Sequence, residues 1–218
     1  MYIDKYEFQF GIHTHDCDYV QIILFAEIIN IKLITYGLNS ISLFSSIIMT
    51  HKSIYLVGLM AVGKSTVGKL LAEKLNRPFF DSDKEIEKNA GAEISWIFDV
   101  EGEEGFRDRE EQVIRELSAK TGAIIATGGG VVEREENRKR IAEKGTVIHL
   151  DCPNETLVER VRNDKKRPLL QGSEVDQVLM TLKKRRDPLY TEIADYKFIS
   201  DKQTTSALVR AIIARLDR

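Results

Sequence analysis

Residues 58–66 read Gly-Leu-Met-Ala-Val-Gly-Lys-Ser-Thr, a glycine-rich segment that ends in a cation and two hydroxyls. A short apolar run at 54–57 precedes this segment and predicts a buried strand. Apolar residues at helical spacing follow it: Val67, Leu70, Leu71 and Leu75. A strand, a glycine loop and a helix in this order aim backbone N–H groups and a helix N-terminus at a polyphosphate. Lys64 adds a charge for the β- and γ-phosphates and Ser65 a hydroxyl for Mg²⁺, so the segment predicts that the chain binds a nucleoside triphosphate.

Two carboxylates follow the next apolar run. Residues 78–80, Pro-Phe-Phe, predict a second short strand, and Asp81-Ser82-Asp83 comes directly after it. Phosphoryl transfer needs one acid near Mg²⁺ and one that orients or deprotonates an acceptor hydroxyl. The pair of carboxylates therefore favours a kinase over the other nucleotide-binding classes that share the glycine loop. A GTPase is also disfavoured, because the chain has no Asn-Lys-x-Asp guanine signature.

A triple glycine and a basic stretch complete the set of candidate functional segments. Residues 128–130 are three adjacent glycines after an apolar run at 123–126, and such a backbone lets a small ligand approach closely. Arg167 begins the sequence Arg-Pro-Leu-Leu inside a polar stretch at 163–173. This setting suits a lid arginine that reaches the transferring phosphate and helps to exclude water.

The remaining cations have a simpler interpretation as charges on solvated helices. Arg109 and Arg115 fall on the long charged helix predicted for 103–120, and on spacing alone Arg107 reads in the same way. The run Lys-Lys-Arg-Arg at 183–186 reads as a solvated helix end.

The elements that must position these residues alternate between strand and helix. Strands are predicted at 54–57, 78–80, 123–126, 146–150 and 196–199. Helices are predicted at 67–75, from 83 onward, at 94–100, 103–120, 135–143 and 155–162, in two segments split by Pro188, and at 206–216. This order predicts an α/β fold with a parallel sheet and helices on both faces. Ligands of such sheets bind at the carboxyl ends of the strands, which places the glycine loop, Asp81, Asp83 and the triple glycine around one crevice.

Composition limits the possible partners. The formal net charge is −2, so no surface for nucleic acid is predicted. The two cysteines, Cys17 and Cys152, have no framework spacing and are expected to be free thiols in a reducing cytosol.

The first 48 residues differ sharply from the rest, with eleven Ile, no Arg and only two Lys. Residues 33–50 are uncharged, but they include Asn39 and several Ser, and the residues before them are net acidic, so we expect no membrane anchor. His13, His15 and Cys17 alternate in a segment with no other domain signal, and we predict no metal site there. We expect the domain to span 49–218, with 1–48 as a poorly ordered extension or an over-called start. A chain beginning at Met49 should then fold and work.

Taken together, the motifs resemble those of the shikimate kinase family, and they look most similar to those of its enterobacterial members. They occur in the family's order from Met49 to the C-terminus: the glycine loop, Asp81-Ser82-Asp83, Glu101-Gly102-Glu103-Glu104-Gly105-Phe106-Arg107, the triple glycine, Arg167-Pro168-Leu169-Leu170 and Arg186-Asp187-Pro188-Leu189-Tyr190. The resemblance implies a cytoplasmic, monomeric P-loop kinase that phosphorylates the 3-hydroxyl of shikimate with ATP and Mg²⁺, in the pathway to chorismate and the aromatic amino acids. It also implies a nucleoside-monophosphate-kinase-like three-layer sandwich, with a five-stranded sheet of order 2-3-1-4-5, and no nucleic-acid or membrane partner.

The resemblance also assigns roles to individual positions. Substrate residues fall on Asp83, Arg107, Gly129 and Arg186. Nucleotide contacts fall on Ala61, Val62, Gly63, Lys64, Ser65, Thr66, Arg167 and, near the adenine, Gln203. Metal ligands fall on Ser65 directly and on Asp81 through water, and catalysis on Lys64, Asp83 and Arg167. Arg160 and Arg162 near the lid remain unassigned, because the chain and the family differ in length there.

One residue departs from the family pattern, and two other functions stay open. Ala61 stands where the family usually has Gly, so a positive φ at this position would affect nucleotide affinity. A related small-molecule kinase, such as a gluconate kinase, would share the glycine loop but not the whole set of motifs. A catalytically silent nucleotide-binding module would have no need of Lys64, Asp83 and Arg167 together.

Overall fold

The computed structural model describes residues 52–162, 175–201 and 203–217. The chain divides into two units, Met1–Thr50 and His51–Arg218, and all described residues belong to the second. The predicted extension with its His13–Cys17 segment, the predicted lid at 163–173 and Arg167 lie outside the described residues. The domain boundary at Met49 therefore stays a prediction.

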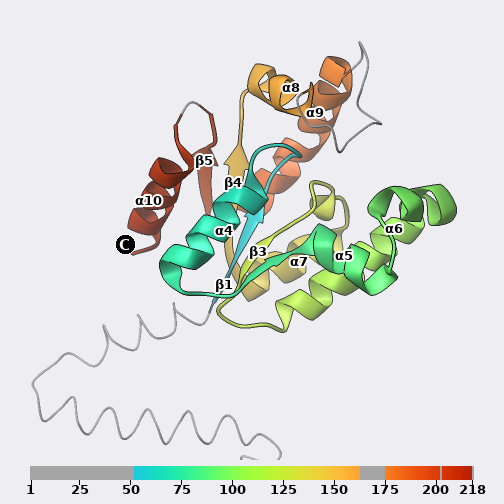
Figure 1. Cartoon of the computed structure of the whole chain (residues 1–218), viewed down its shortest axis with the longest axis horizontal. Helices are drawn as coiled ribbons and strands as arrows, with labels where there is room; N and C mark the ends of the chain where they lie inside the picture. Colours follow the sequence, from blue (N-terminus) through green and yellow to red (C-terminus); the bar gives the residue numbers. More distant parts are fainter. Residues whose placement is uncertain (1–51, 163–174, 202, 218) are drawn as a thin grey trace, which may run out of the picture. The chain divides into compact units, whose positions relative to one another are not determined.

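The described residues form a parallel five-stranded sheet in the order β2-β3-β1-β4-β5 (Figure 1). The strands are β1 Ser53–Val57, β2 Phe79–Asp81, β3 Ile124–Ala126, β4 Gly145–Asp151 and β5 Tyr196–Ile199. Every residue of β1 is buried, because this strand pairs with β3 on one side and β4 on the other and helices cover both faces of the sheet. The predicted parallel sheet and its strand order are confirmed.

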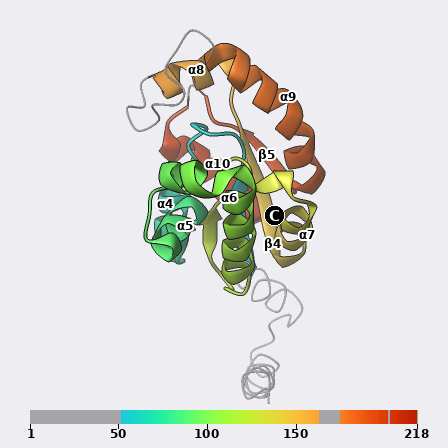
Figure 2. The same ribbon diagram turned by 90° about the vertical axis from the view of Figure 1, so that its right-hand side faces the viewer.

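Helices cover both faces of this sheet. They are α4 Lys64–Leu75, α5 Ser82–Ala90, α6 Ile94–Ser118, α7 Glu135–Lys144, α8 Asn154–Arg162, α9 Val175–Ile193 and α10 Thr205–Leu216, with a 3₁₀ turn η1 at Val131–Glu133. Right-handed crossovers toward opposite edges of a parallel sheet place their helices on opposite faces. Accordingly α4 packs with α10 on one face, whereas α7 packs with α6 and α9 on the other (Figures 1 and 2).

The carboxyl ends of β1, β2 and β3 meet at one edge of the sheet. β1 runs into the glycine loop and α4, β2 ends on Asp81, and β3 runs into Thr127 and the triple glycine. Asp81 caps α5, since its Oδ1 accepts a hydrogen bond from the backbone N–H of Asp83 at 3.1 Å. The segments that were predicted to surround one crevice, because they follow the carboxyl ends of strands, therefore meet at this edge.

Helix α6 bends at a glycine, as its sequence predicts. Gly102 has φ 71° and ψ −175°, a non-helical conformation that favours glycine and separates the segment from Ile94 onward from the segment that ends at Ser118. The first segment carries Ile94 and Phe98, and the second carries Phe106 and Arg107.

The prediction that Pro188 splits the last long helix in two is wrong. Pro188 lies inside a continuous helix, α9, although a proline removes one backbone hydrogen bond and crowds the preceding turn. Buried side chains hold both halves in line, with Leu179 and Arg186 before the proline and Tyr190 and Ile193 after it. Tertiary packing on both sides therefore outweighs the local cost.

Lys183 on α9 is also not the solvated charge that the sequence predicts. Its ammonium pairs with Asp151 at the end of β4 and with Asp187 one turn further along, at 2.9 Å, and its side chain is only 23% exposed. Lys184 and Arg185 are exposed, as expected.

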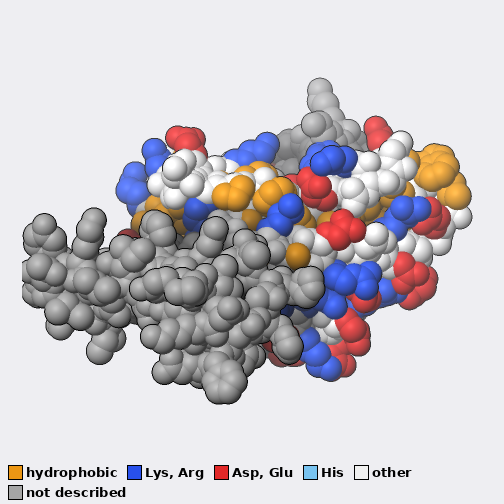
Figure 3. Space-filling model, turned by 90° about the horizontal axis from the view of Figure 1, so that it is seen from below, with side chains coloured by type: hydrophobic (Ala, Val, Ile, Leu, Met, Phe, Trp, Pro, Cys, Tyr) orange, Lys and Arg blue, Asp and Glu red, His pale blue; other side chains and the backbone are white. Residues whose placement is uncertain are grey.

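On the face that Figure 3 shows, Lys and Arg side chains alternate with Asp and Glu side chains. Within residues 52–162, 175–201 and 203–217, every helix is too short or too polar to cross a bilayer. Cys152 is a buried free thiol, and Cys17 lies outside the described residues.

His149 on β4 is a buried imidazole that the fold keeps neutral. Its ring packs on Tyr190, with ring centroids 5.0 Å apart, and its Nδ1 atom has no hydrogen-bond partner among the described residues. Burial first, and then the positive charge of Lys197, lower the pKa of His149 to about 4. Asp151 and Asp187 lie nearby, but the ammonium of Lys183 already pairs with both carboxylates.

This environment predicts a loss of stability in mild acid. The unfolded chain takes up a proton at this residue near pH 6.5, whereas the folded chain resists protonation down to about pH 4. Its contribution to stability is therefore complete above pH 6.5 and declines as the pH falls toward 4, by roughly 3 kcal/mol. In His149→Phe, which keeps a ring against Tyr190, chemical denaturation should show a flatter decline over this range. Parallel curves for wild type and variant would contradict the prediction.

Ala61 in the glycine loop has φ 61°, in the left-handed region. This conformation costs a residue with a Cβ atom about 1–2 kcal/mol of conformational free energy. Glycine adopts it at a lower cost, but its more flexible unfolded state offsets part of the gain in stability. Ala61→Gly should therefore raise the free energy of unfolding by roughly 0.5–1 kcal/mol, measured by thermal or chemical denaturation. Asn76→Gly is the matched control: its φ is 51°, but asparagine tolerates this region, so the gain should be smaller. An unchanged or lowered stability of Ala61→Gly would show that the loop relaxes without cost.

Candidate functional site

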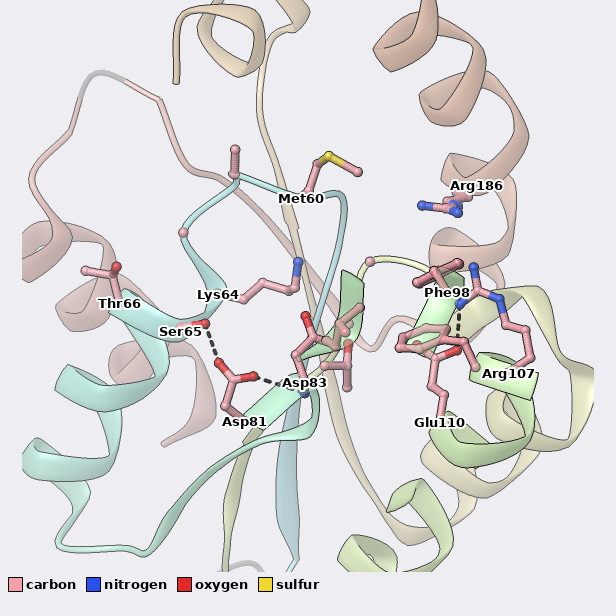
Figure 4. A pocket seen from close by; sticks show the side chains of 18 of the residues that line it. Met60, Lys64, Ser65, Thr66, Asp81, Asp83, Phe98, Arg107, Glu110 and Arg186 are labelled. Atoms are coloured by element: carbon pink, nitrogen blue, oxygen red, sulfur yellow. Dashed lines mark hydrogen bonds and ion pairs between the residues drawn. The ribbon is translucent and has the colours of Figure 1, made fainter. Parts of the chain in front are cut away.

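A cleft of about 780 Å³ lies at the carboxyl ends of β1, β2 and β3, within the size range of sites for small ligands. Its lining includes most of the predicted site residues: Ala61, Gly63, Lys64, Ser65, Thr66, Asp81, Asp83, Arg107, Gly129 and Arg186. Figure 4 shows Lys64, Ser65 and Asp81 at one end, Arg107, Glu110 and Arg186 at the other, and Asp83 between them. Residues from the segments that follow β1 and β3, from the end of β2 and from helices α5, α6 and α9 thus meet in one place.

The glycine loop positions Lys64 at the start of α4. Gly63, the residue before the helix, has φ 95°, a conformation that glycine adopts without strain. The Nζ atom of Lys64 donates hydrogen bonds to the carbonyls of Gly58 and Leu59, both at 2.8 Å. The ammonium therefore lies against the loop whose N–H groups and helix N-terminus favour an anion.

Ser65 and Asp81 lie side by side across the loop. Ser65 Oγ donates to Asp81 Oδ2 at 2.6 Å, and the other carboxylate oxygen caps α5. A hydroxyl next to a carboxylate supplies the oxygen ligands that Mg²⁺ prefers. Asp83 extends from the first turn of α5 toward the middle of the cleft (Figure 4).

Arg107 is a buried cation of the cleft, not a solvated helix charge. Its Nη1 donates to Glu110 at 2.8 Å and its Nη2 to Glu103 at 3.2 Å. Burial opposes its charge, but these two carboxylates prevail and raise the pKa of Arg107. Glu110 is only 1% exposed, and burial raises the pKa of its carboxyl even with Arg107 beside it. Arg109, two residues away, instead binds Glu101 outside the cleft, at 2.7 Å.

Arg186 reaches the cleft from α9, which packs against η1 and β4. Its side chain is 7% exposed, and the guanidinium points into the cleft in Figure 4. Its Nε donates to Glu133 Oε1 at 2.6 Å. Sequence alone placed this residue in a solvated run, and only the family resemblance singled it out.

Side chains crowd against the first and the last residue of the triple glycine. A Cβ atom on Gly128 would lie 2.6 Å from Asp83 Oδ1 and 2.9 Å from Glu110 Oε1. A Cβ atom on Gly130 would lie 2.2 Å from Arg107 Nη1. Both approaches are too short, so the glycines let an acid and an arginine reach the cleft floor.

A second cavity of about 270 Å³ lies beside the glycine loop. Gln203 lines this cavity and not the main cleft, whereas Ala61, Gly63, Thr66 and Arg160 line both. Arg160 fastens the loop to the end of β5, because its guanidinium donates to the carbonyls of Ala61 at 3.2 Å and Ser200 at 3.0 Å.

Among the predicted nucleotide contacts that the structure describes, Val62 has its side chain buried in the core and not in either cavity. It is 1% exposed within the hydrophobic core, and its carbonyl accepts a hydrogen bond from Ser200 Oγ at 2.7 Å. Only its backbone is then placed to take part in the loop. Arg167, predicted for the lid, lies outside the described residues.

Sequence reasoning missed several residues of this site. Glu110 lies three positions after Arg107 on one helix face, and this spacing was a signal that could have identified the pair. Phe98 and Ile94 line the cleft from the first segment of α6, although the sequence marked them only as apolar helix residues. No sequence signal pointed to Glu133, whose partner Arg186 is 53 positions away.

Comparison with known proteins agrees with this geometry. The sequence model of the shikimate kinase family matches residues 60–217. Shikimate kinase 1 of Yersinia pestis (strain Pestoides F) is 51% identical over 167 residues, which cover 76% of this chain and 96% of that protein. Among solved structures, the shikimate kinase from Acinetobacter baumannii in complex with shikimate is 44% identical, with a TM-score of 0.74 over 79% of this chain and 96% of that one. The shikimate kinase from Bacteroides thetaiotaomicron is 32% identical, with a TM-score of 0.71 over 77% and 99%.

The family match spans well over half of the chain and includes every described residue that lines the cleft. The observed strand order is the one that the family resemblance implied. The chain belongs to the shikimate kinase family.

Proposed function

We propose that this protein transfers the γ-phosphoryl group of ATP to the 3-hydroxyl of shikimate, giving shikimate 3-phosphate and ADP on the route to chorismate and the aromatic amino acids. The observation that carries this proposal is the arrangement of the cleft. Two buried arginines, Arg107 and Arg186, lie at the end of the cleft opposite the phosphate loop. Asp83 lies between this pair of arginines and the loop (Figure 4). A small acceptor with a carboxylate at one end and hydroxyls at the other matches this order of charges.

Each end of the cleft has a distinct task. The guanidiniums bind the acceptor's carboxylate through charge-assisted hydrogen bonds. Asp83 accepts a hydrogen bond from the acceptor hydroxyl and takes up its proton as the new O–P bond forms. The bond from the γ-phosphorus to the bridging oxygen breaks, and ADP leaves with the electron pair. Lys64 and the N–H groups of the loop stabilise the charge on the phosphates.

Ser65 and Asp81 form the part of the cleft that fits Mg²⁺. The hydroxyl and the carboxylate are already 2.6 Å apart, and both offer oxygen ligands. Because both Asp81 oxygens already accept hydrogen bonds, Ser65 is assigned as the direct ligand and Asp81 as a ligand through water. An ion held by these residues would neutralise part of the charge on the phosphates.

The remaining parts of the proposal concern the nucleotide and the setting. The second cavity, with Gln203 and Arg160, is assigned to the adenine because it adjoins the phosphate loop. Arg167 is assigned to the lid. We also propose a cytoplasmic monomer with no nucleic-acid or membrane partner, whose catalytic domain begins at Met49. A silent nucleotide-binding module would not need an acid aligned between an arginine pair and a phosphate loop.

The direct test is ADP release in a coupled assay with ATP and Mg²⁺, in the presence of shikimate, in the presence of gluconate, and with no acceptor. We expect turnover with shikimate alone. Turnover with gluconate would favour a related small-molecule kinase, and no acceptor-dependent turnover would favour a silent module.

Replacing the acceptor acid should stop transfer without releasing the nucleotide. Asp83→Asn keeps the size of the side chain but removes the base, so the rate should fall by about 10²–10⁴-fold while ATP binding stays within about twofold. Titration calorimetry for ATP and the ADP assay measure the two effects separately. A variant that turns over at the wild-type rate would reduce Asp83 to a structural role.

Removing either arginine should weaken binding of the acceptor. Arg107→Ala and Arg186→Ala each take one charge-assisted partner from a desolvated carboxylate, which should cost roughly 2–4 kcal/mol in shikimate affinity. Arg115→Ala on α6 and Lys184→Ala on α9 are matched controls, because both side chains are exposed. Unchanged shikimate affinity in both test variants would refute the assignment.

A further inference from the structure

Glu133 makes the contacts that fix the position of Arg186. Its Oε1 accepts from Arg186 Nε at 2.6 Å and from Arg185 Nη2 at 2.7 Å. The carboxylate is about one-fifth exposed, and the pKa of Glu133 is lowered, because the two guanidiniums outweigh its partial burial. The lowered pKa favours the charged form of this carboxylate, which lies behind a cleft arginine.

The contact uses one edge of the guanidinium and leaves the other available. Arg186 presents five N–H donors in a planar fork, and Glu133 takes the Nε–H. The two terminal nitrogens lie at the end of the side chain that points into the cleft (Figure 4). Binding at the Nε edge therefore sets the plane of the fork without using the edge that a ligand carboxylate can bind bidentately.

Without Glu133, other carboxylates would compete for Arg186. Asp83 and Glu110 line the same cleft, and the charge of Arg186 acts on Glu110. Glu110 Oε1 is buried and has no hydrogen-bond partner among the described residues. An untethered guanidinium could turn toward this oxygen and leave the position from which it faces the acceptor.

The backbone beside Glu133 is fixed as well. Glu133 closes η1, the turn that follows the triple glycine, and its N–H donates to the Gly130 carbonyl at 2.9 Å. The Tyr190 hydroxyl on α9 donates to the carbonyl of Gly129. Three side chains of α9 thus contact the segment that forms the floor of the cleft: Tyr190 at Gly129, and Arg185 and Arg186 at Glu133.

We propose that Glu133 is a positioning residue for acceptor binding: it holds Arg186 by its Nε edge so that the terminal nitrogens face the acceptor's carboxylate. This inference rests on the proposed function for the identity of the acceptor, but not for the contact itself. Glu133 does not line the cleft itself, so its loss should raise the KM for the acceptor and leave the rate of the chemical step unchanged.

The kinetic test compares two substitutions at this position. Glu133→Ala should raise the KM for shikimate about tenfold, with kcat and the KM for ATP within about twofold of wild type. Glu133→Gln keeps an oxygen that accepts from Nε, so its KM should lie between those of wild type and Glu133→Ala. Arg185→Ala is the matched control, because it removes the other, exposed partner of Glu133 and should leave the KM for shikimate within twofold.

A second measurement checks the contact without relying on activity. In NMR spectra of arginine side chains, the Nε–H signal that disappears in Arg186→Lys identifies Arg186. This signal should exchange slowly with solvent in wild type and rapidly in Glu133→Ala. Rapid exchange in wild type would overturn the proposal.

The outcomes separate this inference from the proposed function. If wild type phosphorylates shikimate but Glu133→Ala has an unchanged or lower KM for shikimate, the function stands and the inference fails. A glutamine variant as impaired as the alanine variant, or a joint loss of kcat and ATP affinity, would also overturn it. If wild type shows no shikimate-dependent ADP release, the proposed function fails, and the NMR exchange rates alone decide whether Glu133 holds Arg186.

Discussion

Three buried cations in one cleft impose the constraint on which the rest of the site depends. Among the described residues, Lys64, Arg107 and Arg186 are the Lys and Arg side chains that are buried, and all three line the cleft. A buried charge without partners is costly, so each one needs polar atoms close by. Lys64 has two loop carbonyls, Arg107 has Glu103 and Glu110, and Arg186 has Glu133. Much of the remaining sequence around the cleft follows from these pairings.

The polar partners of these three cations leave the cleft able to bind anions. Each guanidinium has five donors, and the described contacts use two of them on Arg107 and one on Arg186. The carboxylates orient the cations, and the unused donors remain for phosphate or carboxylate groups. The glycines belong to the same arrangement, because a Cβ atom at 128 or 130 would displace Asp83 or Arg107.

Sequence predicted the parts of this protein whose chemistry is local. The glycine loop, Asp81 and Asp83 follow strands directly, so a rule about strand ends is enough to bring them together. The bend at Gly102 and the last strand were also visible in the sequence, because each depends on a few adjacent residues. The assignment of Arg107 and Arg186 required the family resemblance, because the neighbouring residues do not show whether a charged side chain on a helix is buried or exposed.

The residues that sequence did not predict depend on contacts between distant segments. Glu133 meets Arg186, and Lys183 meets Asp151, across 53 and 32 positions. The sequence indicates a helix break at Pro188 because the cost of a proline inside a helix depends on adjacent residues. The packing of Tyr190 and Ile193 that offsets this cost depends on distant segments and cannot be recognised in the sequence.

Helix α9 combines most of these long-range contacts, and this explains why it stays intact through its proline. Lys183 pairs with the end of β4, Arg186 reaches the cleft, and Tyr190 contacts both His149 and the triple glycine. A break at Pro188 would separate Arg186 from Tyr190, which lie one turn apart and together join the helix to the cleft floor. The stability of the fold and the binding of an anionic acceptor therefore depend on the same helix. The packing that keeps α9 continuous through Pro188 is therefore also what holds Arg186 in the cleft.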